Sequence, residues 1–221
     1  MIKVENIEVF NFEGALRGMR NPMQSWDKSD TSGNQIGEKD LALAQKLVLS
    51  GTEHAKFMRQ IFVSMDISSA IYWWKEMDTY KVATVANSTS TMHTLTKRNL
   101  MKSDFSLENT EQLLVAEDGP DVSFIIEETI NNLNQILNQY KATGDKRYWE
   151  ALIKLLPESF NQTRTWTANY QTLRNIYFQR RYHKLTEWRE FCKVIEDLPY
   201  GKELICIESD PTFVFKKEKR C

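Results

Sequence analysis

The first segment that could bind an anion covers residues 14–22, where Arg17 and Arg20 stand between glycines and a proline. Glycines let the backbone approach a ligand closely, and a guanidinium group forms forked hydrogen bonds to phosphate. Residues 11–37 show no hydrophobic periodicity, and a connection of this length is uncommon unless it is functional or disordered. We therefore regard residues 11–37 as a long candidate site loop. The alternative is a solvated loop whose arginines pair with nearby acids.

A second candidate segment is a predicted helix over residues 168–182, which carries Arg174, Arg180 and Arg181. Residues 174 and 181 are seven apart and share a face, whereas Arg180 is turned by about 100° from Arg181. One of these two neighbours could point at an anion while the other meets solvent. For each arginine the alternative is an exposed side chain that pairs with a surface acid.

A third feature is the aromatic run Tyr72-Trp73-Trp74, which is followed by a stretch rich in serine and threonine at residues 84–96. Aromatic faces could stack on a ring, and hydroxyl groups could bind phosphate or base edges. The alternative is that the tryptophans pack in the core and the hydroxyl groups belong to turns.

The sequence contains none of the common catalytic motifs, such as Gly-x-Gly-x-x-Gly, a Walker loop, His-Glu-x-x-His or Gly-x-Ser-x-Gly. The histidines His54, His93 and His183 lie far apart in sequence, and a lone histidine is more often structural than catalytic.

The elements that must position these residues follow from hydrophobic periodicity. Period-two alternation predicts strands at residues 1–10, with a possible bulge, and at 57–67. Short closing strands are expected at 204–207 and 213–215. Helical spacing predicts helices at 38–50, 70–77, 122–140, 145–156, 168–182 and 185–197. Strands and helices do not alternate regularly, so an α+β fold is favoured, in a single domain over residues 1–221.

Composition excludes several classes of protein. The 221 residues carry 29 Lys+Arg and 30 Asp+Glu, a net charge of -1, whereas a nucleic-acid binder normally has a basic excess. No apolar stretch approaches the roughly 18 residues of a membrane span, and the N-terminus lacks the pattern of a signal peptide. The three cysteines are widely spaced and suit a reducing compartment. We expect a soluble cytoplasmic protein that binds neither membrane nor nucleic acid.

One stretch, residues 156–180, resembles flavin-dependent thymidylate synthases. Leu156-Pro157 matches the Leu-Pro turn of that family, a strand rich in aromatic residues and threonine follows, and Asn169-Tyr-Gln171 opens a helix as the family's Asn-x-Arg does. Residues 186–189 look like a substituted form of the family's Ala-Gln-x-Glu-Ile-Arg segment. Upstream, Glu53-His54 precedes a strand that leads through Ser68-Ser69 into an aromatic helix, as in the family. The resemblance covers about residues 45–195.

The resemblance implies a central, mainly antiparallel sheet flanked by helices, and a homotetramer with active sites between subunits. It also implies FAD as cofactor and dUMP as the pyrimidine nucleotide, methylated with folate and NADPH. Carried over to this sequence, the cofactor-binding residues are His54, Asn169 and Arg180. With the anion-binding segments, the candidate substrate-binding residues are Arg174, Gln171, Arg17, Arg20, Ser88 and Ser90.

The sequence also departs from the family. If Trp73-Trp74 is aligned with the family's Gln-Trp, then Glu76-Met77-Asp78 stands in place of the Arg-His-Arg signature, and the two acids would repel a phosphate. Alignment on Ser90 and His93 instead places residues 80–82, Tyr-Lys-Val, at the signature. Gln171 stands at the position where the family has a nucleotide-contacting arginine. Arg174, one turn later on the same helix, could take over the role of that arginine.

Two functions are compatible with these patterns. In the first, the chain is a divergent, phage-type thymidylate synthase-like enzyme that acts on a pyrimidine deoxynucleotide. In the second, it is a catalytically inactive nucleotide-binding or interaction protein with the same fold and assembly. The retained His54, Asn169 and Arg180 favour the first function, which we adopt.

Overall fold

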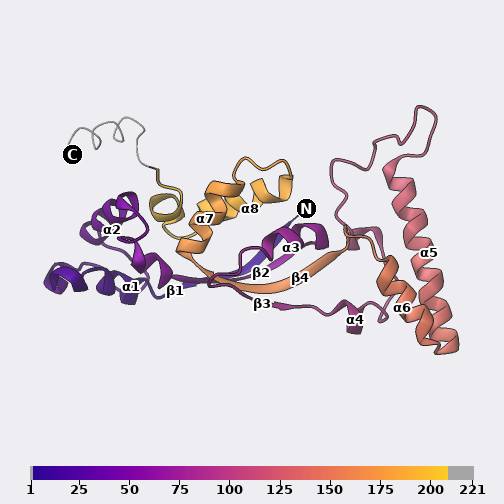
Figure 1. The fold of residues 1–221 in the computed structure, drawn as a ribbon, viewed down its shortest axis with the longest axis horizontal. Helices are drawn as coiled ribbons and strands as arrows, with labels where there is room; N and C mark the ends of the chain where they lie inside the picture. Colours follow the sequence, from indigo (N-terminus) through magenta and orange to yellow (C-terminus); the bar gives the residue numbers. More distant parts are fainter. Residues whose placement is uncertain (1, 209–221) are drawn as a thin grey trace. The chain divides into compact units, whose positions relative to one another are not determined.

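The computed structural model describes residues 2–208 of the chain (Figure 1). The strands are β1 (Lys3–Phe10), β2 (Phe62–Ala70), β3 (Val85–Ser88) and β4 (Asn161–Asn169). The helices are α1 (Phe12–Met19), α2 (Glu38–Ser50), α3 (Ile71–Met77), α4 (Thr91–Thr94), α5 (Val122–Thr143), α6 (Lys146–Leu155), α7 (Tyr170–Arg180) and α8 (Thr186–Asp197). Shorter helical turns are η1 (Asn21–Met23), η2 (Trp26–Lys28), η3 (Lys56–Arg59), η4 (Lys102–Asp104) and η5 (Gly201–Ile205).

The four strands form one antiparallel sheet in the order β1-β2-β4-β3, so the predicted α+β class is confirmed. Strand β1 contains the predicted irregularity, because Asn6 has a φ of 50° at the point where the apolar alternation slips. In β2 the alternation predicted for residues 57–67 is clear, since Val63, Met65 and Ile67 are fully buried.

The chain divides into two compact units, which we describe separately. Among the described residues, unit 1 consists of residues 2–3, 66–79 and 86–165, and unit 2 consists of residues 4–65, 80–85 and 166–208. Both units therefore combine stretches that are distant in sequence. The expectation of a single domain stays a prediction.

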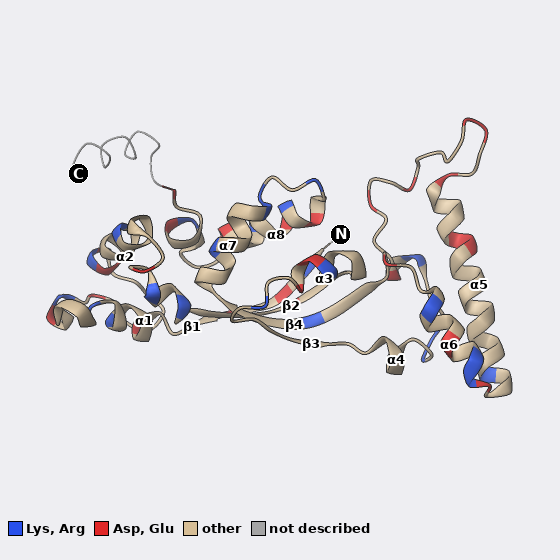
Figure 2. Ribbon diagram, viewed as in Figure 1, with Lys and Arg blue, Asp and Glu red and all other residues tan. Residues whose placement is uncertain are grey.

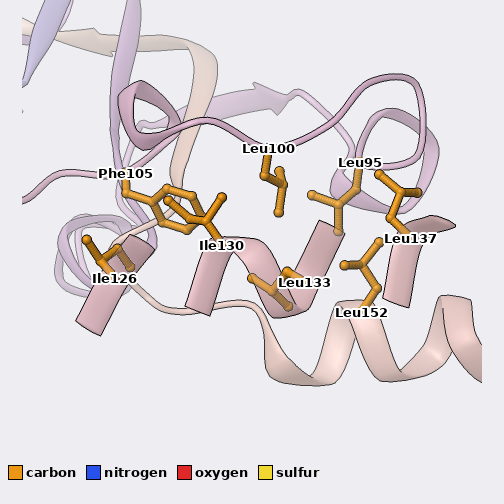
Figure 3. Packing of buried hydrophobic residues seen from close by; sticks show 8 residues of the cluster. All are labelled: Leu95, Leu100, Phe105, Ile126, Ile130, Leu133, Leu137 and Leu152. Atoms are coloured by element: carbon orange, nitrogen blue, oxygen red, sulfur yellow. The ribbon is translucent and has the colours of Figure 1, made fainter. Parts of the chain in front are cut away.

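The core of unit 1 is built on α5 (Figure 3). Four apolar residues of this helix recur every three or four positions and are buried, namely Ile126, Ile130, Leu133 and Leu137. Leu152 of α6 packs into the same cluster. The two helices begin at aspartate caps, because Asp121 accepts a hydrogen bond from Phe124 N and Asp145 accepts one from Arg147 N. Burial of each such side chain contributes about 1.5–3 kcal/mol.

The core of unit 2 is rich in aromatic side chains. Trp166 of β4 and Trp188 of α8 both meet Phe191 edge to face, at centroid distances of 6.3 and 6.2 Å. Phe12 of α1 packs against Tyr170 at 5.7 Å in the same way. These contacts fix α1, α7 and α8 within unit 2.

The structure corrects the expectation of a loop over residues 11–37. Residues 12–19 form α1, whose buried residues Phe12, Ala15, Leu16 and Met19 have helical spacing. Two glycines in this short stretch hide the pattern in the sequence. The rest of the segment contains the helical turns η1 and η2.

The expectation of a closing strand at residues 204–207 is wrong as well. Residues 201–205 form the π-helical turn η5, in which the consecutive residues Leu204 and Ile205 are both fully buried. A half-buried strand would have placed these neighbours on opposite faces. The second expected strand, at 213–215, lies outside the described residues. Strand β3 was not expected, because all four of its residues are exposed and show no alternation.

Candidate functional site

Helix α7 carries most of the residues that the sequence selects, and it follows β4 without a connecting loop (Figure 1). Asn169 is the last residue of β4 and the N-cap of α7. Its side-chain oxygen accepts a hydrogen bond from Thr172 N at 2.9 Å, and the residue is 4% exposed. The observed role of this oxygen is therefore to begin the helix, and cofactor binding by Asn169 stays a prediction.

Arg174 lies one turn further along α7 and is half-buried. Its Nη1 donates to the carbonyl oxygens of Ile205 and Ile207, at 2.6 and 2.7 Å. Its guanidinium group stacks on Phe178 at 4.7 Å, and burial lowers the pKa of Arg174. Arg174 thus ties α7 to the chain after η5. Among the described residues, the hydrogen bonds of its guanidinium group all come from Nη1, so Nε and Nη2 remain for another acceptor.

Gln171, where the family has an arginine, is buried in the first turn of α7 with 7% of its surface exposed. Its Nε2 donates to Asn175 Oδ1 at 3.1 Å, whereas Oε1 has no hydrogen-bond partner among the described residues. A buried acceptor left unsatisfied costs about 1–3 kcal/mol. A bound N–H or O–H group would remove this cost.

The two arginines at the end of α7 both lie against aromatic rings. Arg180 stacks on Trp188 at 4.6 Å and donates from Nε to Tyr80 Oη at 2.8 Å. Arg181 stacks on Phe178 at 4.8 Å and forms an ion pair with Glu208. Arg181 therefore pairs with an acid, as the structural alternative for these arginines predicts. Arg180 stays a candidate ligand of a cofactor.

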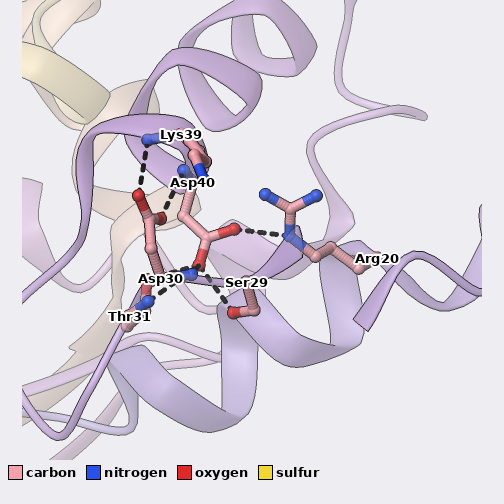
Figure 4. Close-up of polar contacts among 6 residues, drawn as sticks. All are labelled: Arg20, Ser29, Asp30, Thr31, Lys39 and Asp40. Carbon is pink, nitrogen blue, oxygen red and sulfur yellow. Dashed lines mark hydrogen bonds and ion pairs between the residues drawn. The ribbon is translucent and has the colours of Figure 1, made fainter. Parts of the chain in front are cut away.

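Residues 20–40 are folded around one buried carboxylate, that of Asp40 (Figure 4). Arg20 donates from Nε to Asp40 Oδ1 at 2.5 Å, and Oδ2 accepts from Ser29 Oγ at 2.7 Å and Thr31 Oγ1 at 2.6 Å. Burial raises the pKa of Asp40, but the hydrogen bonds from Thr31, Ser29 and Arg20 outweigh burial and hold the pKa below its ordinary value. Arg20 is itself 5% exposed. It is thus a structural partner of Asp40 here, whereas Arg17 is exposed on α1.

The remaining predicted residues lie apart from α7. His54 is exposed in the turn after α2, and its Nε2 lies 3.5 Å from Oε1 of Glu53. Ser88 is exposed at the end of β3, and Ser90 is the N-cap of α4, where its carbonyl oxygen accepts from Thr94 N. Both serines belong to unit 1, whereas every other predicted residue belongs to unit 2. Neither unit on its own brings the full predicted set together.

On the first of the two alignments, acids replace the family's signature, and one of them has a defined environment in unit 1. Asp78, directly after α3, forms an ion pair with Arg164 of β4 at 2.8 Å. The Arg164 guanidinium group stacks on Trp74 at 4.2 Å, and its Nε donates to Gln162 Oε1. Arg164, whose side chain is 14% exposed, therefore neutralises Asp78, whose side chain is 55% exposed. In Figure 2 basic and acidic segments also lie together on α3.

Unit 1 also contains a groove of about 1010 Å³, which the sequence did not reveal. One side presents the hydroxyl groups of Ser68, Thr163 and Thr89. Ser68 Oγ lies 2.6 Å from Thr163 Oγ1, and Thr89 N donates to Thr163 O at 2.9 Å. The volume reaches the upper end of the range of small-molecule sites. The only sequence signal for it was the stretch at residues 84–96, which supplies Thr89, Thr91 and Thr94 to the lining.

Two further features were sought among residues 2–208, a metal-binding cluster and a membrane-spanning helix. No cluster of three or more His, Cys, Asp or Glu side chains in this range is arranged to hold a metal ion. None of the described helices is long and apolar enough to span a membrane.

The sheet order and the strand-to-helix junctions define an α+β protein with the fold of flavin-dependent thymidylate synthases. One similar structure is thymidylate synthase X (ThyX) from Helicobacter pylori with FAD and dUMP. It has a TM-score of 0.68 at 18% identity, over 93% of this chain and 97% of that chain. A second structure of flavin-dependent ThyX from the same organism, complexed with FAD and dUMP, has a TM-score of 0.66 at 18% identity, over 92% and 97%. The fold implied by residues 156–180 is thereby confirmed.

No protein-family model matches the chain, and no curated protein matches it in sequence.

Proposed function

We propose that this chain is a divergent thymidylate synthase-like protein that binds a pyrimidine deoxynucleotide, with dUMP as the first candidate and FAD as the cofactor. The observation that carries the proposal is the extent of the shared fold, 93% of this chain and 97% of a structure that holds FAD and dUMP. An overlap of this extent gives nearly all of the neighbour's fold a counterpart in this chain. At 18% identity, however, the site must be argued from this chain's own residues.

Helix α7 supplies the residues that support nucleotide binding. Arg174 keeps a positive charge, and within residues 2–208 its guanidinium hydrogen bonds come from Nη1 alone. Gln171, three residues earlier, has a buried Oε1 without a hydrogen-bond partner in the same range. Residues three apart lie on the same side of a helix. Such a pair suits a ligand with an anionic part and an N–H group, as dUMP has.

The end of α3 does not fit the pyrophosphate of FAD, because Asp78 is acidic and its partner Arg164 is already neutralised. If FAD binds, its ligands are therefore expected to be His54, Asn169 and Arg180 rather than the signature position. When bound, FAD would carry electrons from NADPH to a reductive methylation.

The same ion pair favours a second candidate function, a nucleotide-binding or interaction protein without catalysis. An internal pair between Asp78 and Arg164 leaves no net positive charge at the place where the family has two arginines. Under this alternative the dUMP site of α7 is kept and the cofactor is lost.

The test uses the purified full-length chain. A yellow preparation that releases FAD on denaturation, binds dUMP in a calorimetric titration and forms dTMP with a folate donor and NADPH supports the enzyme. A colourless preparation that binds dUMP and cannot be loaded with FAD supports the inactive nucleotide-binding protein. A preparation that binds neither ligand contradicts both.

We further propose a homotetramer. The chain contains 6 Trp, 8 Tyr and 11 Phe, and aromatic residues are enriched at interfaces between subunits. The resemblance to flavin-dependent thymidylate synthases also implies active sites between subunits. Sedimentation that finds only a monomer would contradict this assembly.

A further inference from the structure

Unit 1 exposes an apolar surface on the loop before α5 and on the first turn of that helix. Its members are large apolar side chains that are between 43% and 62% exposed, namely Leu113, Leu114, Val115, Phe124 and Ile125. We call these five residues the apolar patch. Exposed apolar residues are normally scattered singly, whereas several together mark an interaction surface.

Main-chain contacts join the two stretches of the patch. Leu114 forms an antiparallel bridge with Asp121, and Val122 N donates to Leu113 O at 3.0 Å. Asp121 is also the N-cap of α5, so this paired segment continues directly into the helix turn that carries Phe124. The loop residues and the start of the helix therefore form one local structure.

The first turn of α5 is apolar on its outer side as well as toward the core. Phe124 stands two residues before the buried Ile126 and is therefore turned by about 200° from it. A helix that is apolar on all sides is normally covered. The described residues leave Phe124 54% exposed, so a cover must come from elsewhere.

The surroundings of the patch are acidic. Residues 103–140 contain eight acids and no lysine or arginine, and Figure 2 shows only acidic segments on the loop directly before α5 and on the first turns of the helix. Glu117, Asp118 and Glu128 are exposed and form no ion pair within residues 2–208. A complementary partner is therefore a segment that is both apolar and basic.

The chain itself contains a segment of this chemistry, residues 213–220, which lies outside the described residues. Its sequence is Phe-Val-Phe-Lys-Lys-Glu-Lys-Arg, with two aromatic residues, four cations and one acid. Aromatic side chains are frequent anchors of interfaces, and opposite charges orient the partners. Identical subunits can exchange such a segment at low cost.

We propose that the apolar patch and its acids bind residues 213–220 of a second copy of this chain. The phenylalanines of that segment cover the patch, and its lysines meet Glu117, Asp118 and Glu128. The contact requires two associated copies, which the homotetramer proposed above would provide. It does not rest on the nucleotide or the cofactor proposed for this protein.

Carbodiimide cross-linking of the purified full-length chain tests the contact, because the reagent joins a carboxylate to a lysine amine that touches it. A denaturing gel separates covalent dimers from monomers, and mass spectrometry locates the links. Links from lysines of residues 216–219 to Glu117 or Asp118 are expected in the dimer band only. Lys154 and Glu150, 3.0 Å apart on α6, should be linked in both bands and report that the reagent has acted.

Two pairs of variants separate the charged part of the contact from the apolar part. Asp118→Lys should lower the yield of the covalent dimer about five-fold. Asp27→Lys changes an equally exposed aspartate of unit 2 and should leave the yield unchanged. Leu114→Ser should lower the yield about ten-fold, and Val82→Ser, at a residue that is 83% exposed, is its control.

Three outcomes would contradict the proposal. Links between residues 216–219 and the acids of the patch in the monomer band alone would exclude a second copy as the occupant. Absence of these links while Lys154 and Glu150 are joined would exclude the contact itself, and sedimentation of the parent would then show whether the homotetramer still stands. A loss in Asp118→Lys without a loss in Leu114→Ser would mean that charge alone attracts the segment and that the patch does not bind it.

Discussion

Arg164 and Asp78 form an ion pair at 2.8 Å, and the Arg164 side chain is only 14% exposed because it lies on Trp74. On the alignment that matches Trp73-Trp74 to the family's Gln-Trp, Asp78 stands at a basic residue of the signature, and a cation from β4 neutralises it. This pair explains how unit 1 accommodates a reversed charge at the end of α3. It also makes the site at α3 an unfavourable place for a phosphate.

The first prediction concerns this pair. Asp78→Arg should destabilise the protein by about 1 kcal/mol, because two cations then face each other. The exchange Asp78→Arg with Arg164→Asp should recover part of the loss, since opposite charges meet again. Urea unfolding followed by tryptophan fluorescence measures the coupling in a double-mutant cycle. The exposed pair Lys75–Glu158 serves as control, with side chains 59% and 57% exposed, and should show no measurable coupling.

A second prediction concerns pH. Asp40→Asn should lower the free energy of unfolding by about 3 kcal/mol at neutral pH, because Arg20 loses its buried partner. The pKa of Asp40 lies below the ordinary value of 3.8 in the folded state. Its contribution to stability is therefore present above pH 4 and disappears as the pH falls through the folded-state pKa. The difference between variant and parent should shrink below pH 4.

Unfolding midpoints measured from pH 7 to pH 3 check this second prediction. The exposed acid Asp27 provides the control, and Asp27→Asn should follow the parent over the whole range. A difference between Asp40→Asn and the parent that stays constant down to pH 3 would contradict the assignment.

The third prediction is that Arg174→Ala weakens dUMP binding by about 10–100-fold, the loss expected for a charge-assisted contact. Because Arg174 also bonds to two main-chain carbonyl groups, circular dichroism must first show that the variant is folded. Arg147→Ala on α6 is the control, with a side chain 88% exposed. Equal binding by Arg174→Ala and the parent would remove the contact from the proposed site.

A fourth prediction concerns the close approach of η5 to α8. A Cβ on Gly201 would overlap the carbonyl oxygen of Ile195 and lie 2.9 Å from that of Glu196. Backbone atoms cannot move aside as a flexible side chain can, so Gly201→Ala should cost about 1–3 kcal/mol. Gly33→Ala, which meets no atom within 4 Å but has a φ of +56°, should cost about 1 kcal/mol. Thermal unfolding that ranks Gly33→Ala as the worse variant would be evidence against this packing.

The parts of the fold that could be predicted have a long and regular pattern. Helix α5 repeats its apolar stripe over several turns, and Asp121 and Asp145 mark where helices begin. Helix α1 was missed because it is short and carries Gly14 and Gly18. A few residues of periodicity are too few to outweigh two helix-weakening residues.

The candidate site was predictable only where one element carries it. Gln171 and Arg174 are neighbours on α7, so their relation follows from helical spacing alone. The buried pair of Arg20 and Asp40 was not foreseen, because it joins two elements with no shared pattern. The groove of unit 1 was missed for the same reason. Its shape depends on how separate segments of the chain pack, which no local pattern records.

The direct passage from β4 to α7 at Asn169 restricts how this chain can change in length. One inserted residue between Asn169 and Tyr170 would rotate the helix by about 100° and turn Leu173 and Ile176 out of the core. A deletion in β4 would exchange the two faces of the strand. Residues 107–120 lie in no helix or strand and are mostly exposed, so they carry no such restriction. We therefore expect natural variants of this protein to gain and lose residues before α5 and to keep a fixed count across the junction.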